Sequence, residues 1–288
     1  MALNMATFRT RAATAGVFVA VMLLGLLTSP WTFFLLFTVI HFGCWVEYNR
    51  LARKIDPTFP GNTLLPYAAM GAGWFFMIYS SGLSFGGMSL SAVGRAGCLV
   101  MLAIVLLTGI IAFSREQNRS LGWVVFGLVY ISGSLSAMVD LRMRGSVHAA
   151  EPLFHFAGYA LPLGIFIALW INDTMAYLVG SFIGRTPFSP ISPKKTWEGT
   201  GGGAILCVVT VALLGHWVGL YRLADWIAIG AIVAICGVAG DLFESKLKRM
   251  AGVKDSGSIM PGHGGFLDRF DSLLFAAPLA WLYVKLMM

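Results

Sequence analysis

The side chains best suited to chemistry occur in the C-terminal part of the chain, where acids, a serine and a lysine recur at helical spacing. Four of them lie at i, i+3, i+4 and i+7, which places them on one face of a helix: Asp241, Glu244, Ser245 and Lys248. Beyond a glycine-rich loop, Asp268 and Asp271 are three residues apart at the start of another predicted helix. We therefore expect two helices to bring carboxylates and a lysine together.

Acidic side chains at the mouth of a membrane span are costly unless they bind a cation or pair with a base. Hard carboxylate oxygens suit Mg²⁺, which commonly bridges nucleotide phosphates. Asp241, Asp268 and Asp271 are therefore candidate metal ligands. From the residues alone, the alternative is a set of interfacial ion pairs with neighbouring bases, namely Lys246, Lys248, Arg249 and Arg269.

A second group of candidates begins at Asp173, an acid inside an apolar stretch, and continues through a polar loop. The loop ends with Lys194, Lys195 and Glu198, directly before a glycine run at 199 and 201–203. Lysines there can meet phosphate, and free amides at the start of a helix can hold an anion. Close helix packing is the alternative interpretation of the glycines.

Two histidines receive different interpretations. His263 lies between glycines in the later loop, where it either touches phosphate or stabilises the turn. His41 lies within an apolar stretch and is interpreted as a packing histidine rather than a ligand.

The elements that must position these residues are membrane helices. The chain has 288 residues, of which 58% are hydrophobic and 11% charged, and its mean hydropathy is +0.79. A bilayer must act as its solvent, and a span needs roughly 20 apolar residues. We expect an all-α polytopic membrane protein without strands, because backbone groups in lipid must be satisfied within each helix. Nine spans are expected near 13–28, 31–46, 64–80, 96–113, 121–139, 155–183, 199–219, 226–249 and 268–287.

The basic residues indicate the orientation of these spans. The formal charge is +7, but the lysines and arginines are distributed among short loops, which argues against a nucleic-acid-binding surface. With the N-terminus in the cytoplasm, 15 of the 20 lie on the inner side, so the positive-inside rule predicts a cytoplasmic N-terminus and a C-terminus on the opposite side. Both polar loops then face the cytoplasm.

No long polar stretch separates a soluble domain from the rest of the sequence. We therefore divide the chain only by expected function, and the boundary is approximate. Residues 1–150 contain four of the 13 acidic residues, and residues 151–288 contain the other nine. We expect 1–150 to be an N-terminal transmembrane scaffold and 151–288 to be a C-terminal transmembrane catalytic region of one integral unit.

A dense pattern of 27 residues runs through the later loop and the helix ends beside it: Ser245-x-Leu247-Lys248-Arg249, Lys254-Asp255, then Pro261-x-His263-Gly264-Gly265-Phe266-x-Asp268-Arg269-Phe270-Asp271. This pattern closely resembles the signature of the CDP-diacylglycerol synthase (phosphatidate cytidylyltransferase) family. The segments 192–199 and 173–180 are similar to a second region of that family. Met260 stands where the family has another apolar residue, which is a conservative departure. The specific resemblance covers roughly residues 170–275.

The resemblance implies roles for the candidate residues. It implies that Asp241, Asp268 and Asp271 hold Mg²⁺, with room for a second cation, and that Ser245 and Lys248 are catalytic beside them. It further implies that substrate is bound by Asp173, Ser192, Lys194, Lys195, Glu198, Arg249, Lys254, His263 and Arg269.

The implied reaction is transfer of the cytidylyl group of CTP to phosphatidic acid. We therefore expect CTP, phosphatidic acid and membrane lipids as partners, no nucleic acid, and a homodimer as an option that the sequence does not decide. With the short N-terminus, the resemblance indicates the bacterial cytoplasmic (inner) membrane. The alternatives are a cytidylyltransferase for another lipid or isoprenoid phosphate and, from a different class, an ion-coupled transporter that uses intramembrane acids such as Asp173 and Asp241.

Overall fold

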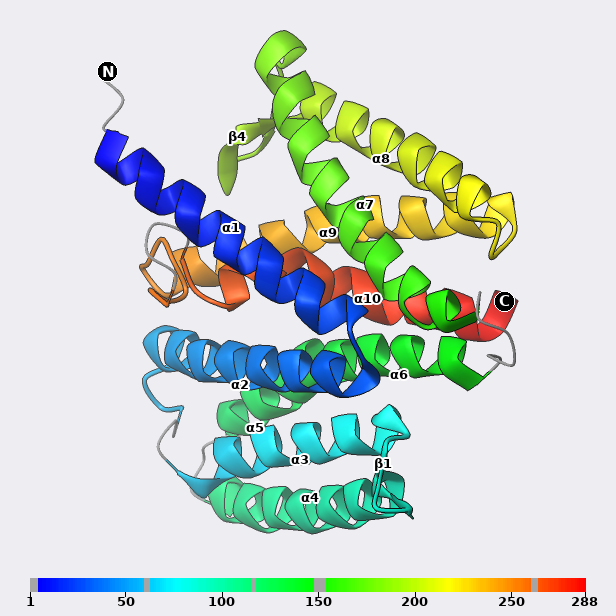
Figure 1. The fold of residues 1–288 in the computed structure, drawn as a ribbon. Coiled ribbons are helices and arrows are strands. Elements are labelled where there is room, and N and C mark those ends of the chain that lie inside the picture. Colours follow the sequence, from blue (N-terminus) through cyan, green and yellow to red (C-terminus); the bar gives the residue numbers. More distant parts are fainter. Residues whose placement is uncertain (1–4, 60–62, 115–117, 148–153, 260–263) are drawn as a thin grey trace. The chain divides into compact units, whose positions relative to one another are not determined.

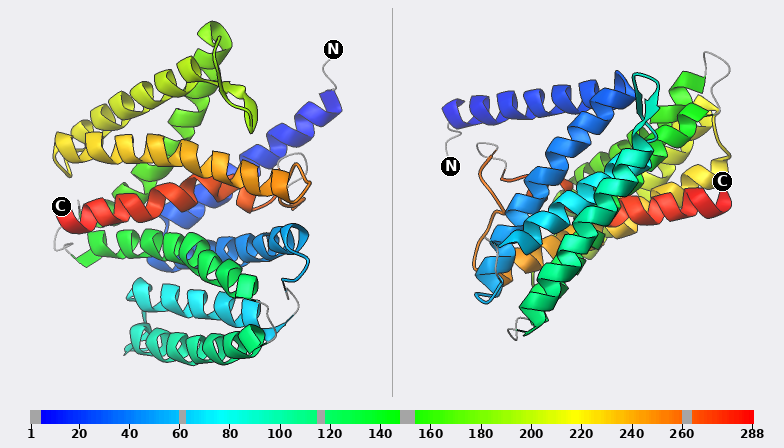
Figure 2. Two further views of the ribbon diagram at one scale, coloured as in Figure 1. Left: turned by 180° about the vertical axis from the view of Figure 1, so that it is seen from behind. Right: turned by 90° about the horizontal axis from the view of Figure 1, so that it is seen from below.

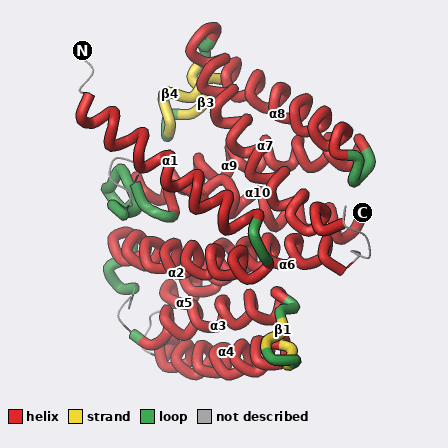
Figure 3. Tube along the Cα trace, in the orientation of Figure 1, coloured by secondary structure: helices red, strands yellow, loops and turns green. Residues whose placement is uncertain are grey.

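A computed structural model describes residues 5–59, 63–114, 118–147, 154–259 and 264–288, and helices dominate it (Figures 1 and 3). In chain order the elements are α1 (Met5–Leu27), α2 (Pro30–Ile55), α3 (Leu64–Ser81), β1 (Ser84–Phe85), β2 (Met88–Ser89), α4 (Leu90–Ser114), α5 (Asn118–Gly127), the π-helix η1 (Leu128–Gly133), α6 (Ser134–Val147), α7 (Phe154–Ile183), β3 (Pro187–Ser189), β4 (Ser192–Thr196), α8 (Trp197–Val218), α9 (Leu223–Met250) and α10 (Leu267–Met287). The expected all-α polytopic membrane architecture is confirmed.

Each stretch expected to span the membrane is helical. Among the described residues, seven stretches are long and apolar enough to cross a bilayer: Pro30–Ile55, Leu90–Ile111, Ser120–Met143, Gly158–Ile183, Trp197–Val218, Leu223–Met250 and Leu267–Met287. The remaining two expected spans coincide with α1, whose described apolar part is Thr14–Leu27, and with the 18-residue α3.

Two short hairpins lie in the connections between helices, where no strand was expected. β1 pairs antiparallel with β2, and β3 pairs antiparallel with β4. The first hairpin turns through Gly86 and Gly87, which both have positive φ, as tight hairpin turns require. The expectation of no strands was wrong here because the hydropathy of the spans carries no information about the loops that join them.

By their contacts, the residues form two compact units, and we describe each one separately. Unit 1 comprises Met1–Asp140 and Met250–Arg269, and unit 2 comprises Leu141–Arg249 and Phe270–Met288. The three boundaries fall inside α6, at the end of α9 and near the start of α10, so neither unit is one continuous stretch of chain. The connection that follows α9 is thereby grouped with the N-terminal helices.

A buried polar contact joins three helices of unit 1. The ring nitrogen His41 Nε2 lies 2.9 Å from Ser132 Oγ, and Trp45 Nε1 donates a 2.9 Å hydrogen bond to the same hydroxyl. Gly73 of α3 packs directly on this hydroxyl, because a Cβ at position 73 would collide with it. His41 is completely buried, which agrees with its interpretation as a packing residue.

In unit 2, glycines allow helices to approach closely. The helices α7 and α8 lie side by side (Figure 2), and a Cβ at Gly199 or Gly203 would lie 2.7 Å from backbone atoms of Ala176. This favours the packing interpretation of the glycine run. Gly240 plays the same part between α9 and α10, because its Cβ would lie 2.5 Å from the carbonyl oxygen of Asp271.

Candidate functional site

The hairpin between α7 and α8 presents Lys195. Its strands pair Pro187 with Thr196 and Ser189 with Ser192. The hydroxyl of Thr196 then caps α8 by accepting a 3.1 Å hydrogen bond from the amide of Gly199. Because the hairpin is fixed at its base by this cap, the position of Lys195, one residue earlier, is fixed as well.

The carboxylate of Glu198 braces the other side of this connection. It accepts 3.1 Å hydrogen bonds from the backbone amides of Arg185 and Thr186, and a 2.8 Å hydrogen bond from the Thr186 hydroxyl. Glu198 was predicted to bind substrate. The structure shows that its carboxylate is engaged in holding the segment that leads into the hairpin.

The polar face of α9 meets this hairpin, and the residues that the spacing predicted to share this face do so. Lys195 Nζ forms an ion pair with Asp241 Oδ2, and both side chains are about a quarter to a third exposed, at 26% and 30%. Ser245 Oγ donates a 3.3 Å hydrogen bond to Asp241 Oδ1. One turn further along, Lys248 pairs with the fully buried Glu244 at 2.5 Å. The face therefore carries two lysine–carboxylate pairs.

Two further aspartates complete what we call the lysine–aspartate cluster, which consists of Asp173, Lys195, Asp241, Ser245 and Asp271. Asp173 of α7 interacts electrostatically with Lys195 and with Asp241. Asp271 of α10 interacts electrostatically with Asp241 and Asp173, and also with Lys248. Four elements of unit 2 thus converge on a site with more acidic than basic side chains, which favours a cation or a cation-bearing ligand.

The carboxylate oxygens of this cluster are of the kind that Mg²⁺ prefers. No three His, Cys, Asp or Glu side chains converge into a complete metal cage within the part of the chain that the structure describes. Mg²⁺ usually needs only one or two carboxylates, with substrate phosphates and water supplying the other ligands. Asp241 and Asp271 offer hard oxygen ligands of this kind.

A second carboxylate arrangement, which we call the Glu47 network, lies in unit 1 and joins α2 to the start of α10. Glu47 Oε2 accepts hydrogen bonds from Ser256 Oγ at 2.7 Å and from the Leu267 amide at 2.9 Å. Its Oε1 accepts a 3.0 Å hydrogen bond from the Phe266 amide. Asp268 belongs to the same network, because its Oδ2 accepts hydrogen bonds from Ser256 N, Ser256 Oγ and Gly265 N at 2.8–2.9 Å.

The remaining predicted site residues lie around these two arrangements. In unit 2, Lys194 and Arg249 are exposed and Ser192 is half-buried at the end of the hairpin turn. In unit 1, Lys254 and Arg269 are exposed. His263 and Met260 lie in the segment 260–263, outside the described residues. The predicted grouping of Asp241, Asp268 and Asp271 around one metal stays a prediction.

Sequence reasoning missed Glu47 and Ser256. Glu47 was assigned to the scaffold, although a carboxylate at the mouth of a membrane span is costly unless it is paired, which is a signal for function by itself. Ser256 carries no such signal, because its contact with Glu47 spans 209 residues of sequence and follows no local spacing.

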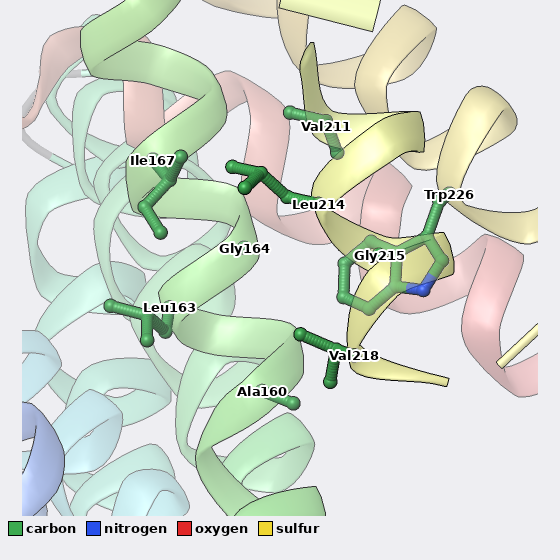
Figure 4. A pocket seen from close by; sticks show the side chains of 9 residues that line it. All are labelled: Ala160, Leu163, Gly164, Ile167, Val211, Leu214, Gly215, Val218 and Trp226. Carbon is green, nitrogen blue, oxygen red and sulfur yellow. The ribbon is translucent and has the colours of Figure 1, made fainter. Parts of the chain in front are cut away.

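Unit 2 also contains an apolar pocket, shown in Figure 4. It is lined by Ala160, Leu163, Gly164, Ile167, Val211, Leu214, Gly215, Val218 and Trp226. The two glycines make room for the Trp226 ring, since a Cβ at either position would press against it. The lining contains no titratable side chain, so this pocket lacks the groups that phosphoryl chemistry needs.

Comparison with known proteins adds a family match over nearly the whole chain. The sequence model of the cytidylyltransferase family matches residues 9–287. Phosphatidate cytidylyltransferase 4, chloroplastic, of Arabidopsis thaliana is 36% identical over 217 residues, which is 70% of this chain and 54% of that protein.

Two microbial proteins named phosphatidate cytidylyltransferase are also similar. The protein of Synechocystis sp. is 43% identical over 146 residues, or 48% of each chain. That of Staphylococcus aureus is 36% identical over 184 residues, covering 63% of this chain and 65% of its own length. The matches span about half to two thirds of the relatives' lengths.

Proposed function

The chain belongs to the cytidylyltransferase family, and from this premise we propose that it is a phosphatidate cytidylyltransferase. It would convert CTP and phosphatidic acid into CDP-diacylglycerol and pyrophosphate, a step of phospholipid biosynthesis. The names of the relatives from Arabidopsis thaliana, Synechocystis sp. and Staphylococcus aureus support phosphatidic acid as the acceptor.

The observation that carries this proposal is the lysine–aspartate cluster. Lys195 comes from the hairpin, Asp173 from α7, Asp241 and Ser245 from α9, and Asp271 from α10. Cation-binding carboxylates beside a lysine are what two phosphate-bearing substrates require, because their mutual repulsion must be offset before they can react.

In the proposed reaction, an oxygen of the phosphatidic acid phosphate forms a bond to the α-phosphorus of CTP. The bond between that phosphorus and the oxygen bridging to the β-phosphate breaks, and pyrophosphate leaves. The attacking oxygen is already anionic, so no side chain must remove a proton from it. The protein must position the substrates and offset the negative charge of their phosphates. Lys195 and Lys248 are the positively charged side chains placed to do this.

We include Mg²⁺ in the proposal, with Asp241 and Asp271 as ligands and Asp268 as the third ligand that the sequence pattern indicates. When bound with CTP, the ion would neutralise phosphate charge and orient the triphosphate. Room for a second cation remains part of this expectation.

We also propose nine membrane spans, with the N-terminus in the cytoplasm of a bacterium and the C-terminus across the inner membrane. The distribution of 15 of the 20 basic residues supports this topology. Lys195, Asp241 and Lys248 would then face the cytoplasm, where CTP is available, while the lipid phosphate would reach them from the bilayer.

The test is product formation by the purified protein in nanodiscs with CTP, Mg²⁺ and phosphatidic acid, beside an Asp268→Ala variant. The proposal expects CDP-diacylglycerol from the wild type and at least about a 100-fold lower rate from the variant. If the wild type binds CTP but ignores phosphatidic acid and uses another lipid or isoprenoid phosphate, the acceptor is wrong. Ion flux in proteoliposomes without nucleotide would instead support a transporter.

A further inference from the structure

Glu47 lies in the second half of α2, directly after the apolar stretch 31–46, and only 4% of its surface is exposed. Burying a carboxylate is costly, so a chain that buries one must satisfy its oxygens. Three hydrogen-bond partners of Glu47 lie far away in sequence, in the connection that leads into α10 and in the first residue of that helix: Ser256, Phe266 and Leu267.

The contacts fix the backbone at the start of α10. Leu267 is the first residue of that helix, and the first amides of any helix lack partners within it. Glu47 accepts hydrogen bonds from the Leu267 amide and from the preceding Phe266 amide, one with each oxygen. A side chain of α2 therefore serves as a charged cap for α10.

The same contacts fix Asp268, one residue later. The hydroxyl of Ser256 lies 2.7 Å from Glu47 Oε2 and 2.9 Å from Asp268 Oδ2, so it sits between the two carboxylates. Asp268 Oδ2 is held in addition by the amides of Ser256 and Gly265. One oxygen of Asp268 is thereby fixed in direction by a network that Glu47 completes.

Two glycines show how closely the chain approaches Glu47. A Cβ at Gly257 or at Gly265 would collide with its carboxylate. The backbone thus passes directly beside the two oxygens.

We propose that Glu47 is a positioning residue that holds Ser256 and the start of α10 so that the Asp268 carboxylate keeps one orientation. The catalytic half of this inference rests on the proposed cytidylyl transfer, whereas the structural half does not. Glu47 itself need not touch either substrate, because it acts through the backbone and through Ser256.

The structural half is tested by hydrogen–deuterium exchange of the intact protein in nanodiscs, comparing wild type, Glu47→Gln and Glu47→Ala. Glutamine keeps the shape but removes the charge and one acceptor oxygen. Exchange at the Phe266 and Leu267 amides should speed up roughly tenfold in the glutamine variant and more in the alanine variant. Ser132→Ala is the matched control, because it removes another buried hydrogen-bonded group of unit 1 without touching these amides.

The catalytic half is tested with the same variants in the product assay. Misplacing Asp268 should raise the Mg²⁺ concentration needed for half-maximal rate by about tenfold in Glu47→Gln, and excess Mg²⁺ should restore part of the rate. KM for phosphatidic acid should change less than kcat. Ser132→Ala should leave all of these kinetic values at wild-type levels.

Three outcomes would overturn the inference. The first is unchanged exchange at Phe266 and Leu267 in Glu47→Gln. The second is faster exchange with an unchanged Mg²⁺ dependence, which would make Glu47 a purely structural cap. The third is equal kinetic losses in Glu47→Gln and Ser132→Ala. If the wild type makes no CDP-diacylglycerol while exchange changes as expected, the proposed function fails and the structural role of Glu47 stands.

Discussion

In the Glu47 network, the carboxylate oxygens accept hydrogen bonds from backbone amides and a serine hydroxyl, and the turn they hold is built around them. In the lysine–aspartate cluster, three aspartates instead interact electrostatically with one another, and Lys195 is the lysine that interacts with two of them, Asp173 and Asp241. Both oxygens of Glu47 are satisfied by the protein itself. The lysine–aspartate cluster instead leaves negative charge that a ligand can offset. The hydrogen-bond partners of Glu47 and of the cluster aspartates therefore distinguish an acid that fixes a turn from acids that keep charge available for a ligand.

The largest effect should follow from Asp241→Asn, which preserves the size of the side chain but removes the charge at the centre of the lysine–aspartate cluster. We expect the rate of CDP-diacylglycerol formation to fall at least about 100-fold, because both the Lys195 pair and a ligand oxygen are lost. The thermal midpoint should change little, since the side chain is partly exposed. A rate within threefold of wild type would show that the cluster is only a structural ion-pair network.

A smaller effect should separate two adjacent lysines. Lys195→Gln removes the cation that pairs with Asp241 and should raise KM for CTP by roughly tenfold or more. Lys194 is exposed, so Lys194→Gln should raise KM for CTP less. Steady-state kinetics on both variants measure the difference. Equal effects would mean that the loop attracts the nucleotide by its overall charge, without a specific role for Lys195.

Glu198→Gln should lower the activity less than the lysine substitution does. This carboxylate acts indirectly, because it holds the segment that leads into the hairpin. We expect a loss of about three- to tenfold in kcat/KM. In combination with Lys195→Gln the two losses should be less than additive, since Glu198 would act through Lys195. Fully additive losses in this double-mutant cycle would instead favour a direct contact between Glu198 and substrate.

The smallest effect on activity should come from Ser132→Ala in the packed core of unit 1. It removes the hydroxyl shared by His41 and Trp45 and should lower the free energy of unfolding by about 1–2 kcal/mol. Thermal unfolding in detergent should show the loss, while rates measured on the folded protein stay unchanged. A large kinetic defect would place this buried polar contact in the reaction instead.

The sequence predicted the helices well because hydropathy and span length are local properties of the chain. It also predicted that Asp241, Ser245 and Lys248 share a face of one helix, since helical spacing determines this directly. The hairpin that presents Lys195 was not predicted, because a short pair of strands in a loop leaves no hydropathy pattern. The sequence left two interpretations of the glycine run open, anion binding and close helix packing. The position of α7 favours packing.

The Glu47 network lay beyond sequence reasoning for a physical reason. Its contact between Glu47 and Leu267 joins residues 220 positions apart, and no periodicity links them. Local patterns reveal which residues share an element, whereas they do not reveal which elements pack together. The role of Glu198 is similar, because its partners Arg185 and Thr186 meet it only once the hairpin has formed.

We propose that the lysine–aspartate cluster transfers the α-phosphate of CTP, with its nucleoside, to phosphatidic acid. The most direct measurement supplies purified protein with phosphatidic acid and CTP labelled at either the α- or the γ-phosphate, and follows the label into extracted lipid. We expect the α-label to enter the lipid and the γ-label to stay in the water phase as pyrophosphate. We expect Asp241→Asn to abolish the transfer. Label from the γ-phosphate in the lipid, or full transfer by the variant, would contradict it.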